Sequence, residues 1–179
     1  MVEVSAVTTR RDPIYHTMLR FNSREHFKSR NNDFWHDYQA AGRAKVPGFD
    51  PGTRYDVHFP PAGRNFHAVA SLRKPDDETP RRLIEGLFGA YGYLKRVVVV
   101  DDDIDIRDPA QVEWAQATRV GRPEQITVSR GLGSRIDASR DPSDQRVVKV
   151  GIDATVPLAQ RDEVIRPGLT ESGFRKKDP

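Results

Sequence analysis

The chain has 179 residues, and its 29 Lys and Arg against 26 Asp and Glu give a formal net charge of +3. This length suits one domain, with or without a tail. Only 36% of the residues are hydrophobic, so the apolar side chains must be concentrated in a few segments. The basic excess is too slight to predict nucleic-acid binding, which requires a clustered basic face.

Several other classes of protein are excluded. No part of the chain contains the run of ~20 apolar residues that a membrane span requires. The first residues lack the basic and apolar regions of a secretory signal. Cysteine is absent, which excludes disulfides, cysteine-ligated metals and thiol nucleophiles. We therefore expect a cytoplasmic protein.

The N-terminal third is predicted to hold a strand, a helix and a long loop. Residues 2–9 alternate in polarity, which indicates a short strand. Aromatic residues at helical spacing predict a helix over 23–41. Residues 46–65 are rich in Pro and Gly, which favours a loop around one short strand at 55–59.

The centre of the chain has the clearest pattern. After a strand at 66–72, acidic residues and Pro80 predict a helix that ends near Gly89 or Gly92. Four consecutive valines at 97–100 indicate a strand that is buried on both faces. Asp108 and Pro109 then have the pattern of an N-cap and first helical residue.

The last part of the chain predicts two more strands and a tail. The strands are expected at 125–129 and 147–152, with loops over 130–134 and 137–144 between them. Residues 158–179 are polar and predict an extended tail. Strands alternate with helices along the chain, which is the order of an α/β fold.

Two segments are candidates for ligand binding. The acidic run Asp101-Asp102-Asp103-Ile104-Asp105 follows the valine strand, where α/β sheets bind ligands, and carboxylates suit Mg²⁺. We favour the alternative that these carboxylates accept hydrogen bonds from backbone amides and pair with arginine. The glycines of residues 130–134 would suit a phosphate loop, but the expected strand–loop–helix context is missing, and a plain turn is favoured.

The five histidines do not form a recognisable site. None lies at metal-ligand spacing, and no nucleophile motif accompanies them. We interpret each as a partly buried, hydrogen-bonded side chain. Composition and spacing alone therefore predict an α/β domain without an active site of its own.

Four strings occur together in a set order: Thr-Thr-Arg-Arg-Asp-Pro-Ile-Tyr-His at 8–16, Lys-Arg-Val-Val-Val-Val-Asp-Asp-Asp-Ile-Asp at 95–105, Val-Glu-Trp-Ala at 112–115 with Thr-Arg-Val at 118–120, and Gly-Ile-Asp-Ala-Thr at 151–155. In this order and at this spacing they resemble the C-terminal half of the UbiD family of reversible decarboxylases. These enzymes act on aromatic and α,β-unsaturated acids. The resemblance covers residues 4–157.

The resemblance implies a fold, a cofactor and a division of labour. The implied fold is a three-layer-like α/β sandwich with a mixed, mostly parallel sheet over residues 1–157, followed by a tail over 158–179 that is extended or docks on a partner. Family members use prenylated FMN with a divalent metal (Mn²⁺ or Mg²⁺) and K⁺, and the cofactor supplies the chemistry. The segments that bind it, and a Glu-Arg-Glu set for proton transfer, precede the Asp-Pro-Ile string.

Because Met1 falls close to a domain boundary of the family, we expect the small, C-terminal-domain subunit of a split decarboxylase or carboxylase. A larger UbiD-type chain would bind the flavin, the metal and K⁺ in a hetero-oligomer without nucleic acid or membrane. A truncated piece of a longer enzyme is the alternative. The resemblance places no catalytic, cofactor-binding or metal-ligating residue in this chain. It implies substrate-pocket contacts at Ile14, Gly131, Leu132 and Gly133.

Two other functions remain open at this level. One is a non-catalytic structural or oligomerisation module with the same fold. The other is a small-molecule or nucleotide-binding domain that uses residues 131–134 together with the acidic run. The identity of the substrate and the direction of the reaction are not predicted.

Overall fold

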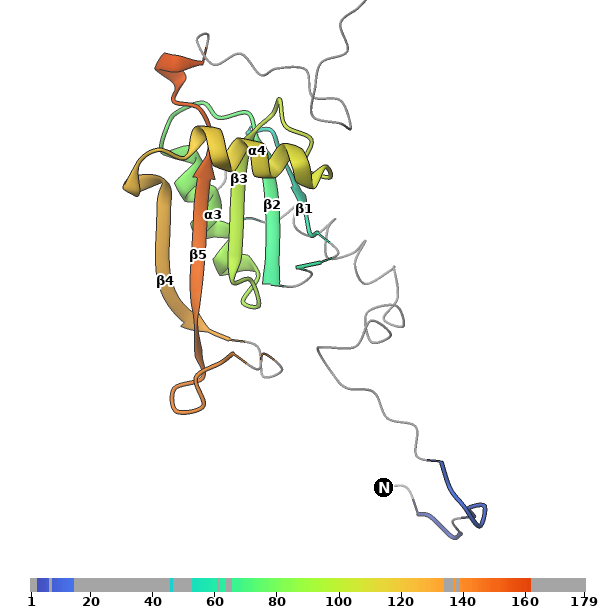
Figure 1. Cartoon of the computed structure of the whole chain (residues 1–179). Helices are drawn as coiled ribbons and strands as arrows, with labels where there is room; N and C mark the ends of the chain where they lie inside the picture. The colour runs from blue at the N-terminus through green and yellow to red at the C-terminus, as the bar shows by residue number, and fades with distance from the viewer. Residues whose placement is uncertain are drawn as a thin grey trace, which may run out of the picture.

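The computed structural model describes residues 3–6, 8–14, 46, 53–60, 62–63, 66–133, 137 and 139–161. The expected helix over 23–41 lies outside these residues, as does the tail beyond residue 161. Within them the chain forms one mixed sheet with a helix on each face (Figure 1). The α/β fold class is therefore confirmed.

The sheet has five strands in the order β1-β2-β3-β5-β4. The three central strands β2, β3 and β5 run parallel, and the outer strands β1 and β4 run antiparallel to their neighbours. The mixed sheet is as expected, with two parallel and two antiparallel pairings among the described strands. The strands are β1 (Tyr55–His58), β2 (His67–Leu72), β3 (Arg96–Asp101), β4 (Ile126–Leu132) and β5 (Arg146–Ala154).

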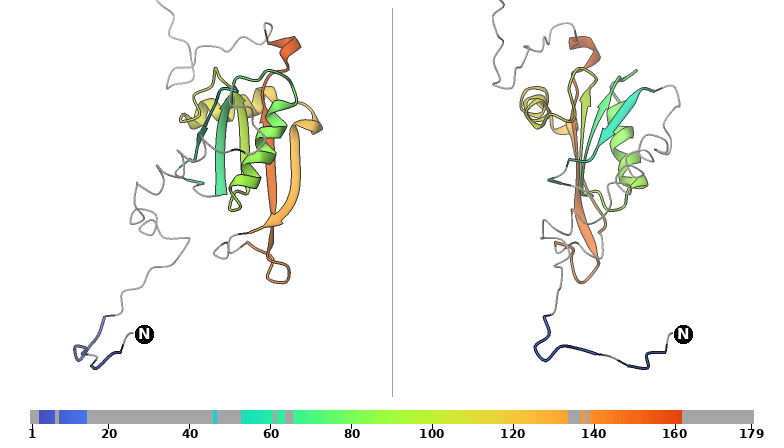
Figure 2. Two further views of the ribbon diagram at one scale, coloured as in Figure 1. Left: turned by 180° about the vertical axis from the view of Figure 1, so that it is seen from behind. Right: turned by 90° about the vertical axis from the view of Figure 1, so that its right-hand side faces the viewer.

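The valine strand β3 forms the centre of the molecule. Val97 and Val99 point into one core cluster, and Val98 and Val100 point into the other. Because strand side chains alternate between faces, four β-branched residues in a row can fill two apolar layers at once. The two helices cover these layers from opposite sides (Figure 2).

Helix α3 (Thr79–Ala90) covers the first face. Its buried side chains Leu83, Ile84 and Leu87 recur at helical spacing and pack in the first core cluster. Ile84 lies so close to β5 that a Cβ added to Gly151 would be 2.3 Å from its Cγ2 atom. Gly151 therefore allows α3 to approach the sheet.

Helix α4 (Pro109–Arg119) covers the second face. The Asp108 side chain accepts a hydrogen bond from Ala110 N at 2.9 Å, and Pro109 occupies the first turn, which confirms the predicted cap. Val112 and Ala115 pack in the second core cluster with the other face of β3. Together α3, the sheet and α4 form the three expected layers.

Two expectations were wrong within the described residues. Residues 3–6 and 8–9 form no strand, because alternating polarity without a partner strand does not make a ladder. Strand β4 continues to Leu132, so residues 130–132 are not loop. The start of the tail, Leu158–Gln160, is a short 3₁₀ helix. Among the described residues, no helix combines the length and apolar character needed to cross a membrane.

Candidate functional site

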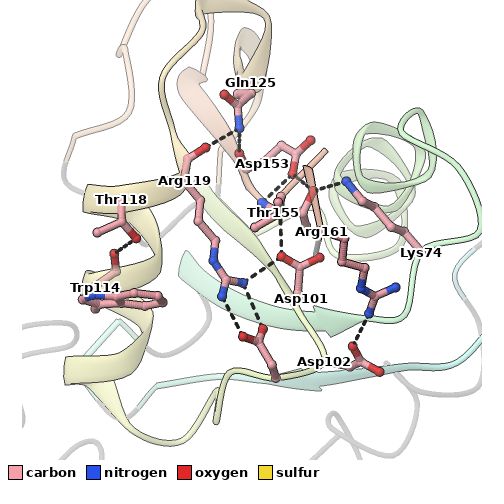
Figure 3. Close-up of polar contacts among 12 residues, drawn as sticks. Lys74, Asp101, Asp102, Trp114, Thr118, Arg119, Gln125, Asp153, Thr155 and Arg161 are labelled. Carbon is pink, nitrogen blue, oxygen red and sulfur yellow. Dashed lines mark hydrogen bonds and ion pairs between the residues drawn. The ribbon is translucent and has the colours of Figure 1, made fainter. Parts of the chain in front are cut away.

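The carboxyl ends of β3 and β5 carry a network of charged side chains, shown in Figure 3. We call it the carboxyl-edge network. It consists of Lys74, Asp77, Asp101, Asp102, Asp103, Arg119, Asp153, Thr155 and Arg161. Open α/β sheets generally bind ligands beyond the carboxyl ends of their strands, so this edge is where a site is expected.

Arg119, the last residue of α4, is the centre of the network. Its side chain is 2% exposed and donates from Nη1 to Asp101 Oδ2 at 2.7 Å. It also makes two bonds to Asp103, at 2.9 Å from Nη1 and 2.6 Å from Nη2. The Trp114 ring lies 5.2 Å from the guanidinium carbon. A buried cation is thus neutralised by two carboxylates that follow the valine strand.

Asp101 joins three parts of the fold. Its Oδ2 atom also accepts a hydrogen bond from Val156 N at 2.8 Å, just beyond β5. Burial raises the pKa of the Asp101 carboxyl, and the bonds from Val156 and Arg119, which favour the charged form, offset part of this rise. Asp101 therefore serves to hold β3, α4 and the end of β5 together.

Lys74 binds the same edge from the loop after β2. Its Nζ atom donates to Thr155 Oγ1 at 2.9 Å and pairs with Asp77 Oδ1 at 2.8 Å, and its side chain is 3% exposed. Thr155 in turn donates through Oγ1 to Asp153 at 2.7 Å. Burial raises the pKa of Asp153, and the hydrogen bonds from Thr155 partly oppose that effect.

The acidic run therefore pairs with arginine, as we favoured. Asp101 and Asp103 bind Arg119, and Asp102 binds Arg161 at 2.9 Å. Among the described residues, no group of three or more His, Asp or Glu side chains is placed to hold a metal ion. Most of the carboxylate oxygens that would suit Mg²⁺ are used in holding the fold together.

The network does not fit prenylated FMN either. A flavin needs an apolar or aromatic slot for its ring and cations for its phosphate. Here Lys74, Arg119 and Arg161 each contact a carboxylate. The side chains of the carboxyl-edge network therefore act as a scaffold.

The candidate pocket residues Gly131, Leu132 and Gly133 lie at the other end of the sheet. Gly131 pairs with Val147, whereas Asp101 follows the pairing of Val100 with Ala154. The seven steps along β5 from Val147 to Ala154 span roughly 23 Å at about 3.3 Å per residue. The glycine-containing segment and the acidic run therefore cannot form one binding site, which removes the nucleotide-binding alternative that needed both.

Gly131 and Gly133 have structural roles that the sequence did not predict. A Cβ on Gly131 would lie 2.5 Å from Lys149 Cε, and one on Gly133 would lie 2.7 Å from Val147 Cγ1. Lys149 uses this space to donate to the carbonyls of Gly92 and Leu94, at 3.0 and 2.8 Å. The absence of a side chain at Gly131 thus allows Lys149 to bind two backbone carbonyls of the segment that follows α3.

The other candidate residues lie apart from the network. Ile14 is 78% exposed in a segment without helix or strand, and the structure does not bring it together with residues 131–133. Of the histidines in the described part, His58 lies on β1 and His67 begins β2. Within the part of the chain that the structure describes, His67 Nε2 is buried and has no hydrogen-bond partner, in contrast to the hydrogen-bonded histidine that we expected.

The residues that sequence reasoning missed are Arg119 and Lys74. Arg119 looked like an ordinary basic residue at a helix C-terminus, where it also suits the helix dipole. The only signal was the acidic run itself, because several carboxylates beside a buried strand need a cation nearby. Lys74 carried no signal, since its partner Thr155 is 81 residues away.

Residues 51–154 match the family model described as the 3-octaprenyl-4-hydroxybenzoate carboxy-lyase C-terminal domain. The chain therefore belongs to the UbiD family of decarboxylases and carries the family's C-terminal domain. The resemblance seen in the four strings is confirmed.

The relatives are larger enzymes. Anhydromevalonate phosphate decarboxylase of Methanosarcina mazei is 34% identical over 174 residues, which are 96% of this chain and 39% of the relative. The enzyme of the same name from Methanothermobacter thermautotrophicus is 40% identical over 107 residues, 59% of this chain and 25% of the relative. The chain thus spans between a quarter and two fifths of the length of these relatives.

Solved structures also match this chain over only part of their own length. The UbiD-class enzyme HmfF of Pelotomaculum thermopropionicum, solved with FMN, matches with a TM-score of 0.68 and 35% identity, over 89% of this chain and 36% of HmfF. An evolved dimeric form of HmfF was solved with prFMN. The 3,4-dihydroxybenzoic acid decarboxylase AroY of Klebsiella pneumoniae matches with a TM-score of 0.65 and 25% identity, over 79% of this chain and 30% of AroY.

Proposed function

We propose that this chain is the C-terminal-domain subunit of a split UbiD-type decarboxylase or carboxylase. The observation that supports the proposal is the family match: residues 51–154 match the C-terminal domain of the family, and the fold resembles part of HmfF with a TM-score of 0.68. The substrate would be an aromatic or α,β-unsaturated carboxylic acid. The domain would span residues 1–157, and residues 158–179 would form a tail that docks on the partner.

The flavin belongs to the partner in this proposal. Prenylated FMN, with Mn²⁺ or Mg²⁺ and K⁺, would bind a larger chain that also carries the Glu-Arg-Glu set. Two observations support this division. HmfF, which is longer, binds FMN, and the carboxyl-edge network of this chain pairs its own cations with its own carboxylates.

This chain would contribute surface to the assembly. Three exposed apolar side chains, Ile126, Val128 and Leu132, lie on one face of the edge strand β4, and Val148 of β5 lies beside them. They are between 47% and 70% exposed. An apolar edge strand with unpaired backbone groups is a template for association with another chain.

The pocket wall would come from the end of the same strand. Leu132 is 70% exposed and would pack against the substrate, beside Gly131 and Gly133, whose Cβ positions are filled by Lys149 and Val147. Ile14 would complete the wall. These side chains would exclude water and orient the acid, and they would transfer no proton.

The test is reconstitution. The full chain is co-expressed with a larger UbiD-type chain that contains the Glu-Arg-Glu region, in cells that make prenylated FMN. We expect a stable complex, a flavin absorption spectrum, and decarboxylation that neither chain performs alone. In a second reconstitution, the Leu132→Asp variant replaces the parent chain. This combination should assemble poorly or turn over poorly. Turnover by this chain alone with bound flavin would overturn the proposal.

A further inference from the structure

Arg54, just before β1, and Arg73, just after β2, lie opposite one another at the end of this strand pair. Tyr55 pairs with Leu72, so the same register places Arg54 opposite Arg73, and Arg73 N donates to Arg54 O at 3.0 Å. Like charges at directly opposite positions of an antiparallel pair repel each other. A pair of this kind indicates that something else supplies the compensating charge.

The described side chains do not supply it. Neither guanidinium has a hydrogen-bond or ion-pair partner among the residues that the structure describes, and both are exposed. The nearby carboxylates have other arginines: Asp56 pairs with Arg107 at 3.2 Å and Asp102 with Arg161 at 2.9 Å (Figure 3 shows the second pair). Among the described residues, neither guanidinium is therefore paired with a carboxylate.

The two arginines line a hollow of about 360 Å³. Its other lining residues are Tyr55, Asp56, Ser71 and Asp102. The hollow lies directly beyond the carboxyl ends of the parallel strands β2 and β3, where α/β sheets generally bind ligands. Ser71 is two residues before Arg73 on the same face of the strand and presents a hydroxyl group.

We propose that this hollow binds a phosphate group, held between the guanidiniums of Arg54 and Arg73 with the Ser71 hydroxyl as a further donor. A phosphate carries up to two negative charges and three acceptor oxygens, which match two arginines and a hydroxyl. A single carboxylate would neutralise only one of the two cations. Asp56 and Asp102, which also line the hollow, are paired with Arg107 and Arg161.

The site does not depend on a partner chain, because all its residues belong to this one. Binding is measured by isothermal titration calorimetry on the full chain at low ionic strength, with glycerol 3-phosphate, inorganic phosphate, FMN and acetate as probes. We expect both phosphate probes to bind and acetate to bind at least tenfold more weakly. Tighter binding of glycerol 3-phosphate would identify a phosphomonoester as the natural ligand, and equal binding would identify the free ion.

The variants Arg54→Gln and Arg73→Gln should each weaken phosphate binding at least tenfold. The matched control is Arg81→Gln, an exposed arginine of α3 that pairs with Glu85 and should leave binding unchanged. Without phosphate, both test variants should unfold at the same temperature as the parent chain or higher, because a repulsive pair has been relieved. A loss of stability would indicate structural arginines and overturn the proposal, as would unchanged phosphate binding.

The affinity for the FMN probe distinguishes failure of this inference from failure of the proposed function. Since FMN carries the same phosphate group, affinity equal to that of glycerol 3-phosphate means that only the phosphate is recognised. FMN binding that is tenfold tighter would place the flavin on this chain, which would overturn the division of labour and the site as described here. If Arg54→Gln weakens association with the larger chain but not phosphate binding, an acidic segment of that chain fills the hollow, and the proposal is wrong.

Discussion

Two regions of the sheet differ in how their side chains are paired: the carboxyl ends of β3 and β5, and the outer strand β4. At the carboxyl ends of β3 and β5, a buried arginine, a buried lysine and their carboxylates are paired within hydrogen-bond distance. At β4, which pairs with β5 on one side only, apolar side chains are exposed in a row. The charged side chains at the carboxyl ends of β3 and β5 are paired with one another within the chain. Strand β4 has the character of a surface made for another chain, so stability and association should depend on different residues.

The largest effect should come from Arg119→Ala. This change leaves the buried Asp101 carboxylate without its cation, and breaking a buried pair in this way costs about 3–5 kcal/mol. Denaturation in urea should show the loss as a lower midpoint. The control Arg81→Ala removes an exposed arginine of α3 outside the network and should change little. A loss below about 1 kcal/mol for Arg119→Ala would mean that the carboxyl-edge network does not stabilise the fold.

Gly151→Ala should have the next largest effect. The added Cβ would overlap Ile84, and overpacking of this kind costs typically about 1–3 kcal/mol. The double variant with Ile84→Ala removes the Cγ2 atom that is in the way, so its loss should be smaller than the sum of the two single losses. Independent, additive losses in the two variants, measured by chemical denaturation, would show that α3 has room to shift.

The stability of the fold should fall as the pH decreases from 6.5 toward 4. Burial, followed by the charges of Arg96 and His58, lowers the pKa of His67 to about 4. In this window the unfolded chain binds a proton at His67 that the folded chain does not, so stability rises with pH. After allowance for partial exposure, the effect is about 1–2 kcal/mol. His67→Gln should flatten the pH profile between these values. An unchanged profile would show that His67 is protonated normally.

Val128→Lys should have the smallest effect on stability and the greatest on association. Val128 is 67% exposed, so the free energy of unfolding should change by less than about 0.5 kcal/mol. The same lysine would disrupt an apolar interface and weaken assembly with the larger chain at least tenfold, measured by light scattering or sedimentation. The matched control, Glu113→Lys on the exposed side of α4, should leave assembly unchanged. Equal assembly of both variants would place the interface elsewhere.

Local pattern was enough to predict the central elements. The valine run predicted a strand covered on both faces, and Asp108 with Pro109 predicted the start of α4, because burial and capping act over a few neighbouring residues. Strand β4 was predicted too short. Its last residues have no strand pattern, and pairing with residues 146–148 of β5 holds them in the sheet. The same pairing explains why residues 130–132 are not a turn.

The candidate site was less predictable, because its parts meet only after folding. The sequence predicted the acidic run at the end of β3 and its pairing with arginine, but not which arginine. It also grouped the acidic run with residues 131–134 in one alternative, although β4 runs antiparallel to β5 and carries Gly131 and Leu132 to the opposite end of the sheet. Strand direction decides which chain ends share an edge, and a single strand's sequence does not encode its direction in the sheet.

The sequence by itself determined the family, the α/β order and the buried strand at its centre, since these depend on residue types in a fixed order along the chain. Tertiary structure alone decided three further points. It paired Lys74 with Thr155, made Gly131 a space for Lys149, and set Arg54 against Arg73. Each of these contacts joins residues that are 18 to 81 positions apart, and only the packing of the sheet brings such residues within hydrogen-bond or van der Waals distance.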